Sequence, residues 1–311
     1  MHHFQNLLYV SHGTNEETAG LKQALSLARN NNAALEVLVI APEFPQDFPD
    51  HKKKFEESLI AQAQSSIDST RDALKLEEPV NISIQLLVNQ KPAIKIIQHA
   101  IQQDYDLIIK EAEPQDNKSG FKALDMELLR KSPMPLWLCR PIKHHRQDIQ
   151  VAVAIDPIND EPVSVSLSED LLELSRSLSD SCSGELQIIS CWDYPLETEL
   201  KNNVFIKIPD DQIVQKVEKA RQNHLLQVER LVEKSGITGT NSIHHIRGKA
   251  DLKIPEFVNK QRIDILVMGT VARTGIPGLI FGNTAENIIQ NLPCSLLALK
   301  PKGFVSPVST K

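Results

Sequence analysis

Short apolar runs alternate along the chain with longer segments in which apolar residues recur every three or four positions. The short runs predict buried β-strands, and the longer segments predict amphipathic α-helices. We expect strands at residues 7–11, 35–40, 82–88, 106–110 and 136–140, and again at 151–155, 186–191, 242–246, 263–268 and 295–299. Strands separated by helical segments indicate right-handed crossovers and a mostly parallel sheet covered by helices on both faces.

Two of the expected helices, at residues 52–74 and 211–234, are long, and each carries one apolar stripe. The stripe of the first contains Phe55, Leu59, Ala63, Ile67 and Leu74. The stripe of the second contains Ile213, Val217, Ala220, His224, Val228 and Leu231. Both helices are therefore expected to pack along one side against a sheet.

The order of these elements is repeated. Residues 128–141 and 288–301 each form a helix end, a proline turn, a buried strand, and then a basic residue before proline. The starts of the two copies, residues 6–13 and 150–157, also match. A repeat of this length is a domain, so we expect two α/β domains, at residues 1–142 and 149–303, joined by a charged linker.

Composition narrows the class of protein. The chain has 311 residues, of which 41% are hydrophobic and 24% charged, as in an average soluble protein, and its net charge is −6. It has no basic excess for nucleic acid and no apolar run of about 18 residues for a membrane span, and we expect no signal peptide. The four cysteines lack metal-ligand spacing, so we expect reduced, packed thiols in a cytoplasmic protein; they are Cys139, Cys182, Cys191 and Cys294.

A glycine-rich segment in the second copy carries the clearest chemical signal. It spans residues 269–286, follows the expected strand 263–268 and leads into a helix beginning near Asn283. Glycines let backbone N–H groups approach a ligand, and a helix N-terminus supplies unpaired donors and a positive dipole. Such a loop between a parallel strand and a helix is typical of phosphate binding.

The second copy resembles a domain of the universal stress protein family. The nucleotide motif of that family is glycine, two residues, glycine, nine residues, then glycine followed by serine or threonine. The chain has this spacing at Gly269, Ala272 and Gly282, with Asn283 after it, so two identities depart. The tandem arrangement with a degenerate first copy is similar to the E-type tandem members.

The resemblance implies a five-stranded fold of the adenine-nucleotide-binding type in each copy. It also implies that the copies pair through their last strands, 136–140 and 295–299, as an intramolecular pseudo-dimer, and that the protein accumulates under stress. The implied ligand is ATP, alone or with Mg²⁺. The implied ligand site comprises Asp156, Cys191, Gly269, Ala272, Arg273, Gly275, Gly282, Asn283 and Thr284.

Chemistry supports such roles and also allows simpler ones. A carboxylate beyond the end of a strand can accept a ribose hydroxyl, but Asp156 precedes Pro157 and is equally compatible with a turn. Asn283 and Glu286 have the pattern of a helix cap. The methyl group of Ala272 crowds a close phosphate or resists positive φ, so a modified phosphate ligand is as plausible as ATP.

The first copy is expected not to bind a nucleotide. His12 stands where Asp156 stands in the second copy, and residues 110–120 replace the glycine loop. This segment places Glu111, Glu113 and Asp116 where phosphate would lie, and their charges would repel a polyphosphate. We therefore expect a structural or partner-binding domain.

Several other activities lack their motifs. The chain has neither a phosphate-binding P-loop with lysine nor a Gly-x-Ser-x-Gly elbow, and its adjacent histidine pairs do not suit a metal. We therefore expect a non-catalytic stress-response protein that binds an adenine nucleotide. The alternatives are a carrier of a lipid-like or nucleotide-sugar ligand, and a protein-binding scaffold. Dimerisation between chains stays open.

Overall fold

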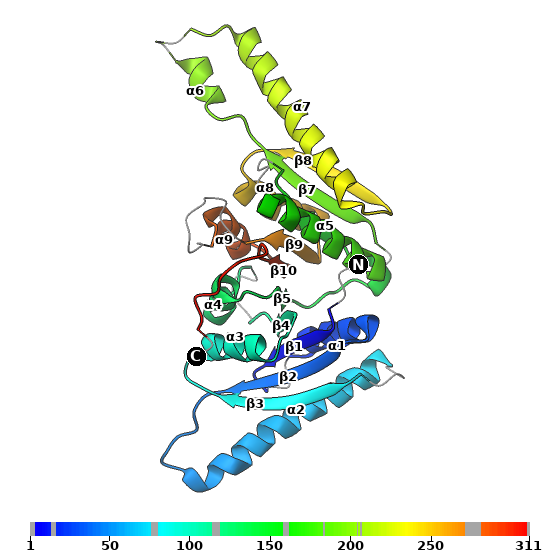
Figure 1. Cartoon of the computed structure of the whole chain (residues 1–311), viewed down its shortest axis with the longest axis vertical. Coiled ribbons are helices and arrows are strands. Elements are labelled where there is room, and N and C mark those ends of the chain that lie inside the picture. The colour runs from blue at the N-terminus through cyan, green and yellow to red at the C-terminus, as the bar shows by residue number, and fades with distance from the viewer. Residues whose placement is uncertain are drawn as a thin grey trace.

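The computed structural model describes residues 4–13, 17–75, 80–113, 119–157, 162–182, 184–203, 205, 207–270 and 281–309. Within them, β-strands alternate with α-helices along the chain, as the hydrophobic pattern predicts (Figure 1). We call β1–β5 with their helices the first half of the molecule, and β6–β10 with theirs the second half.

The strands of the first half are β1 (Asn6–Ser11), β2 (Ala34–Ala41), β3 (Ile82–Val88), β4 (Leu107–Glu111) and β5 (Leu136–Cys139). Those of the second half are β6 (Val151–Ala154), β7 (Leu186–Trp192), β8 (Asn241–Arg247), β9 (Ile265–Gly269) and β10 (Ser295–Leu299). Every strand predicted from the sequence is present within a few residues of its expected bounds.

The helices of the first half are α1 (Thr18–Asn31), α2 (Lys52–Leu74), α3 (Pro92–Gln102) and α4 (Ala123–Lys131). Those of the second half are α5 (Pro162–Cys182), α6 (Glu197–Asn202), α7 (Asp210–Ser235), α8 (Ala250–Gln261) and α9 (Asn283–Gln290). Two short 3₁₀ turns, Pro49–His51 and Arg146–Asp148, precede α2 and β6. The short helix α6 was not predicted, because its six residues contain too few apolar positions to show a period.

All the described strands form one sheet in the order β3-β2-β1-β4-β5-β10-β9-β6-β7-β8. Neighbouring strands are parallel within each half. The two halves meet where β5 and β10 pair in antiparallel fashion, with Leu297 opposite Trp137. The two predicted five-stranded sheets therefore pair through their last strands, as expected, and make one continuous sheet.

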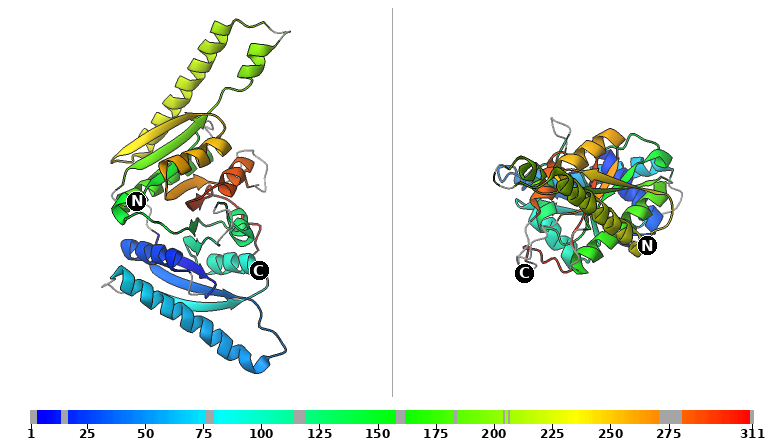
Figure 2. Two further views of the ribbon diagram at one scale, coloured as in Figure 1. Left: turned by 180° about the vertical axis from the view of Figure 1, so that it is seen from behind. Right: turned by 90° about the horizontal axis from the view of Figure 1, so that it is seen from above.

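Alternate residues of the strands enter two cores, one on each face of the sheet. Leu7 belongs to the core that also contains residues of α1, α2, α5 and α7. Leu8 belongs to the core that also contains residues of α3, α4, α8 and α9. Both predicted long helices, α2 and α7, lie on the same face, toward opposite ends of the sheet (Figure 2). Because helices cover both faces, the central strands are apolar throughout, which explains their continuous hydrophobic runs.

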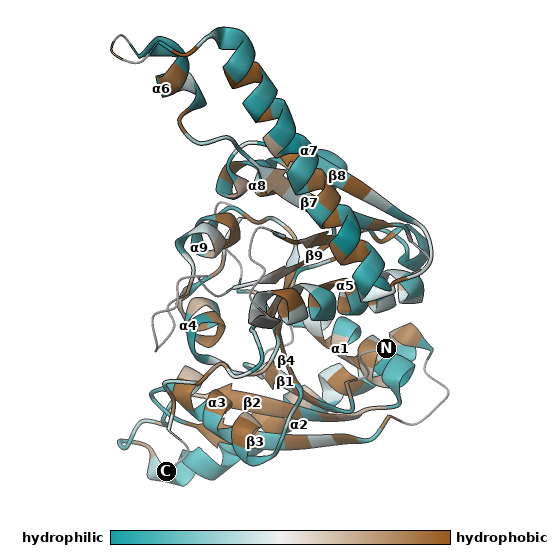
Figure 3. Ribbon diagram, turned by 45° about the horizontal axis from the view of Figure 1, so that its top comes forward, coloured by the Kyte–Doolittle hydropathy of each residue, from teal (hydrophilic) through white to brown (hydrophobic). Residues whose placement is uncertain are grey.

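The long helix α7 reaches beyond the sheet. Its N-terminal part and α6 project from the end of the second half, and the outer surface of α7 is mostly polar (Figure 3). Trp192 at the end of β7 is buried against Ile213 and Val217 near the base of this projection. Trp192 and Trp137 are both buried. Among the described residues, every helix is too short or too polar to span a bilayer.

Candidate functional site

The predicted site residues Asp156, Cys191 and Gly269 lie at the carboxyl ends of the neighbouring parallel strands β6, β7 and β9. Strand β6 is flanked by β9 on one side and β7 on the other. From β6 the chain proceeds to β7 and β8 in one direction, and β9 and β10 lie in the other direction. The point where a parallel sheet changes direction leaves a crevice beyond the carboxyl ends of its strands, where ligands bind. Asp156 follows β6 and Gly269 ends β9, the two neighbouring strands at this point.

Asp156 is half-buried, and its carboxylate acts on the thiol of Cys191 in the next strand. The pKa of Cys191 is raised to about 11, mainly by burial and in addition by the charge of Asp156, whereas Lys253 of α8 opposes the shift. Cys191 is therefore a thiol and not a thiolate at neutral pH, which makes it a poor nucleophile. The other three cysteines are buried, and all four thiols are free.

Gly269 has a packing role beside its predicted role in ligand binding. A Cβ atom at this position would lie 3.0 Å from Cδ2 of Leu167, a residue of α5. The absence of a side chain thus allows α5 to approach the end of β9.

The two ends of the glycine-rich segment are held together. Thr270 is fully buried, its N–H donates to the carbonyl of Leu299 at 3.1 Å, and its carbonyl accepts from the N–H of Gly282 at 3.0 Å. These bonds join Thr270 and Gly282 to each other and Thr270 to the end of β10. The predicted site residues Ala272, Arg273 and Gly275 lie outside the described residues.

Helix α9 begins at Asn283, as the sequence predicts, but the predicted cap is wrong. Gly282 occupies the N-cap position, and no side chain in the described structure bonds to the first turn of α9. Asn283 and Thr284 are exposed at the start of the helix. Glu286 lies in the first turn and pairs with Arg130 of α4, which belongs to the first half of the molecule. The expected capping bond is absent because Asn283 is already helical.

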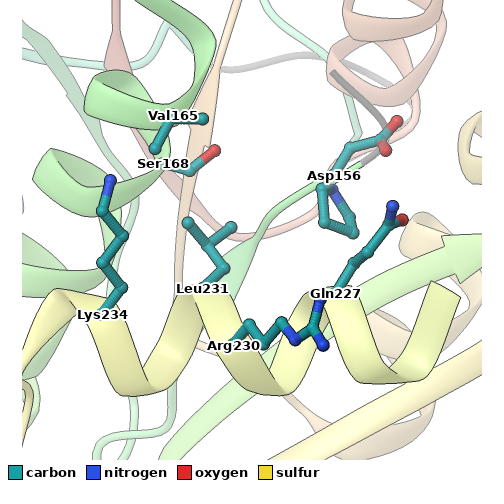
Figure 4. Close-up of a pocket in the computed structure, with 8 residues that line it drawn as sticks. Asp156, Val165, Ser168, Gln227, Arg230, Leu231 and Lys234 are labelled. Atoms are coloured by element: carbon teal, nitrogen blue, oxygen red, sulfur yellow. The ribbon is translucent and has the colours of Figure 1, made fainter. Parts of the chain in front are cut away.

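A pocket of about 300 Å³ lies beside Asp156, between α5 and α7. It is lined by Asp156, Pro157, Val165, Ser168, Gln227, Arg230, Leu231 and Lys234 (Figure 4). In the close-up, Gln227 lies near Asp156, and Lys234 lies at the other end of the pocket near Ser168. Of the predicted site residues, Asp156 lines this pocket.

The polar residues of the pocket wall were missed by sequence reasoning. Gln227, Arg230 and Lys234 recur along α7 beside the buried Val228 and Leu231. A spacing of three and four residues places them on one side of the helix, next to the apolar stripe. This spacing was visible in the sequence, but polar residues on a long helix are usually solvated, so the signal alone does not indicate a pocket.

In the first half, acidic side chains of the protein lie at the carboxyl ends of the equivalent strands, β1 and β4. The strand registers place Glu111 at the position of Gly269. Glu111 accepts a hydrogen bond from the N–H of Gly20 in α1 at 2.6 Å. Burial is the main cause that raises the pKa of Glu111, and the bond from Gly20 opposes this shift. A second carboxylate, Glu17, accepts from the N–H of His12 at 2.8 Å.

The other acidic residues predicted at this edge are engaged by cations or lie outside the described residues. Glu113 lies within 4 Å of Lys110, Lys122 and His12. Asp116 falls outside the described residues. Lys110 in turn makes a fully buried ion pair of 2.9 Å with Asp125.

The histidine pairs noted in the sequence do not gather metal ligands. Within the described ranges, no group of three or more histidine, cysteine or acidic side chains is arranged to hold a metal ion. His144 instead contacts Asp264 at 2.8 Å, and His245 contacts His224 at 2.9 Å. His2 and His3 lie outside the described residues.

Comparison with known proteins gives the family. The model of the universal stress protein family matches the chain twice, at residues 3–140 and 183–300. The chain therefore belongs to the universal stress protein family, as its repeat and loop predicted. It is 28% identical to universal stress protein E of Escherichia coli (strain K12), over 98% of this chain and 96% of that protein. It is 26% identical to universal stress protein E of Photorhabdus laumondii, over 99% and 98% of the two chains.

Solved structures share the tandem fold. A functionally unknown protein from Pseudomonas aeruginosa PAO1 superposes with a TM-score of 0.72 at 22% identity, over 96% of this chain and 93% of that chain. A universal stress protein from Archaeoglobus fulgidus superposes with a TM-score of 0.63 at 15% identity, over 95% and 98% of the chains. At these identities the likeness concerns the fold.

Proposed function

We propose that the chain is a non-catalytic stress-response protein that binds an adenine nucleotide, ATP or a close analogue, in its second half. The observation that carries the proposal is the contrast between the carboxyl ends of the equivalent strands in the two halves. In the first half, Glu17 and Glu111 occupy backbone donors at the edge. In the second half, Gly269 stands where Glu111 stands, and a glycine-rich segment with anchored ends follows it.

The residues present fit a nucleotide in type. Asp156 is placed to accept a ribose hydroxyl at the crevice beside β9. The first turn of α9, with Asn283 and Thr284 exposed, provides N–H donors for phosphate. The neighbouring pocket of about 300 Å³ matches the lower end of the size range of small-molecule sites. Mg²⁺ would enter with the phosphates that it neutralises.

Isothermal titration of full-length protein with ATP and Mg²⁺ tests the proposal. We expect binding near one equivalent, lost in Asp156→Ala, because that change removes the acceptor for the ribose. The matched control is His12→Ala, which alters the equivalent position of the first half and should leave the affinity unchanged. Absence of binding to the unaltered protein contradicts the proposal, and equal loss in both variants would argue against a site in the second half.

The lipid-like carrier proposed as an alternative has less support, because Gln227, Arg230 and Lys234 give the pocket beside Asp156 a polar wall. Native mass spectrometry of gently purified protein separates the two functions. A retained acylated compound would favour the carrier, and a nucleotide mass would favour the proposed site.

A further inference from the structure

One histidine interrupts the apolar stripe that holds the long helix α7 on the sheet. The buried residues of α7 are Ile213, Val217, His224, Val228 and Leu231. Val217 packs on Trp192 near the projecting end of the helix, and Val228 packs in the main core. His224, which is only 6% exposed, lies between these two contacts. Its charge state therefore acts at the centre of the helix–sheet contact.

His224 contacts a second histidine on the edge strand β8. Nδ1 of His224 lies 2.9 Å from Nε2 of His245, and the two rings stack with centroids 5.0 Å apart. The other stacking partner of His245 is Trp192 of β7, with centroids 5.6 Å apart and an angle of 12° between the rings. A hydrogen bond between two imidazole nitrogens needs one donor and one acceptor. The pair can therefore carry one positive charge and keep the bond, but not two.

A neighbouring arginine, Arg221, opposes a second proton on the pair. Arg221 of α7 lies one turn before His224 and is held by Glu218 at 2.7 Å. Arg247 of β8 lies over the ring of Trp192 at 5.4 Å and pairs with Glu197 of α6. Glu218 and Glu197 are thus engaged by these arginines.

His244 and His245 point to opposite faces of β8. His244 is hydrogen-bonded to Gln187 of β7 and packs on Phe257 of α8. Burial, then the proximity of His224 and of Arg221, lowers the pKa of His245, and burial is the main cause that lowers the pKa of His244.

The first half lacks this arrangement. Ile82 lies opposite Leu35, and Asn241 lies opposite Leu186, so the residue four positions further along each edge strand is Leu86 or His245. On the long helices, Ala63 precedes the buried Ile67 by four residues, as His224 precedes Val228. The first half therefore has an alanine and a leucine where the second half has two histidines.

We propose that His224 and His245 form an acid-sensitive latch that holds α7 on strand β8, and that protonation of both rings releases the projecting part of α7 together with α6. Protonation converts both facing nitrogens into donors and places two like charges side by side in a poorly hydrated contact. The same helix carries Gln227, Arg230 and Lys234, so opening of the latch also loosens one wall of the pocket beside Asp156. The latch does not require that this pocket binds a nucleotide.

Hydrogen exchange of the full chain, followed by mass spectrometry at about pH 7.5 and about pH 5.5 and corrected for intrinsic exchange rates, tests the latch. We expect the protection of α7 and β8 to fall by about tenfold or more at the lower pH, because the released helix exchanges by local opening. Peptides from α2 and β3 are the internal control and should keep their protection. Equal protection of α7 at both pH values would overturn the proposal.

A matched variant, His224→Ala with His245→Leu, places the first-half residues in the second half. It should keep α7 protected at both pH values, and a loss of protection like that of the unaltered protein would count against the latch. Should this variant not fold, His245→Phe retains a ring to stack on Trp192 and carries the same expectation. If neither variant folds, equal protection of α7 at both pH values in the unaltered protein still overturns the latch.

Discussion

The two halves of the molecule share a fold but differ in how a helix packs against the carboxyl end of the equivalent strands β4 and β9. In the first half the helix contributes the glycine, Gly20, and the strand contributes the large residue, Glu111, whose carboxylate bonds to the helix. In the second half the strand contributes Gly269, and the helix contributes Leu167. The glycine that allows close approach thus lies on the helix in the first half and on the strand in the second half. The first occupies backbone donors with a carboxylate, and the second leaves the strand end without a side chain.

The largest difference in energy concerns the buried pair Lys110–Asp125. The strand registers and the repeat place Met268 and Ala285 at the equivalent positions, and both are buried. Asp125→Ala removes the closer carboxylate partner of the buried Lys110 ammonium, at 2.9 Å, and leaves Glu113 at 3.7 Å. It should lower the free energy of unfolding by about 3–5 kcal/mol. The double change Lys110→Met with Asp125→Ala copies the second half and should recover most of this loss, because no buried charge remains.

Denaturant unfolding monitored for each variant checks this prediction through the midpoint and slope of the transition. Burial is the main cause that raises the pKa of Asp125, and Lys110 opposes it, so the ion pair has to offset a large desolvation cost. A double variant as unstable as Asp125→Ala would mean that the pair has a role beyond neutralising itself.

Substitution of the glycine at these two helix–strand contacts should give the next largest effect on stability. Gly20→Ala places a Cβ 2.8 Å from Cβ of Glu111 and 3.1 Å from its backbone nitrogen, which cannot move without shifting β4. We expect a loss of about 1–3 kcal/mol in the free energy of unfolding. Among the described residues, the nearest atom to the new Cβ of Gly269→Ala is at the end of the flexible Leu167 side chain, at 3.0 Å, so this change should cost less than about 1 kcal/mol. Thermal unfolding of both variants would reveal a reversed order.

Much of this architecture could be predicted from the sequence, because it depends on local patterns. The strand β10 is apolar on both faces, and its match to β5 in the repeat predicted the pairing at the centre of the sheet. The His224–His245 contact and the Arg130–Glu286 pair could not be predicted in this way. Each joins residues on separate elements through side-chain geometry, and each residue alone has the pattern of an ordinary helix or strand position.

Lys300 and Arg140 occupy equivalent positions after β10 and β5 but differ in their partners. The guanidinium of Arg140 donates to the carbonyl of Gly120. Nζ of Lys300 makes no hydrogen bond to the described part of the chain and lies 4.0 Å from the ring centroid of Phe304. Burial lowers the pKa of Lys300 to about 7, so Lys300→Met should raise the free energy of unfolding at pH 7 by at least about 1 kcal/mol.

The pH dependence gives a second test of Lys300. The unfolded lysine titrates near 10.4, so between about pH 7 and pH 10 the unfolded chain binds more protons than the native chain. The contribution of Lys300 to stability therefore rises with pH in this window and should be missing in Lys300→Met. Arg140→Met should instead destabilise the protein at neutral pH. An identical pH profile for Lys300→Met and the unaltered protein would show that the lysine is solvated.

The smallest expected effect links the two halves at the proposed nucleotide site. Arg130 of the first half pairs with Glu286 in the first turn of α9, where phosphate would approach, and the pair is partly exposed. Arg130→Ala leaves the charge of Glu286 unopposed and should weaken ATP binding by about two- to fivefold. Lys131→Ala, which breaks a pair with Glu127 on the same helix, is the matched control and should leave affinity unchanged.

Adding Glu286→Gln to Arg130→Ala distinguishes neutralisation of Glu286 from a direct contact between Arg130 and the ligand. If Arg130 acts by neutralising Glu286, the double variant should regain the affinity of the unaltered protein, and the effect of Arg130→Ala should shrink as salt screens the exposed charges. If Arg130 reaches the phosphate itself, the loss should persist in the double variant. Either result measures how much a residue of the first half contributes to ligand binding in the second half. Such a contribution would mean that the proposed site depends on both halves.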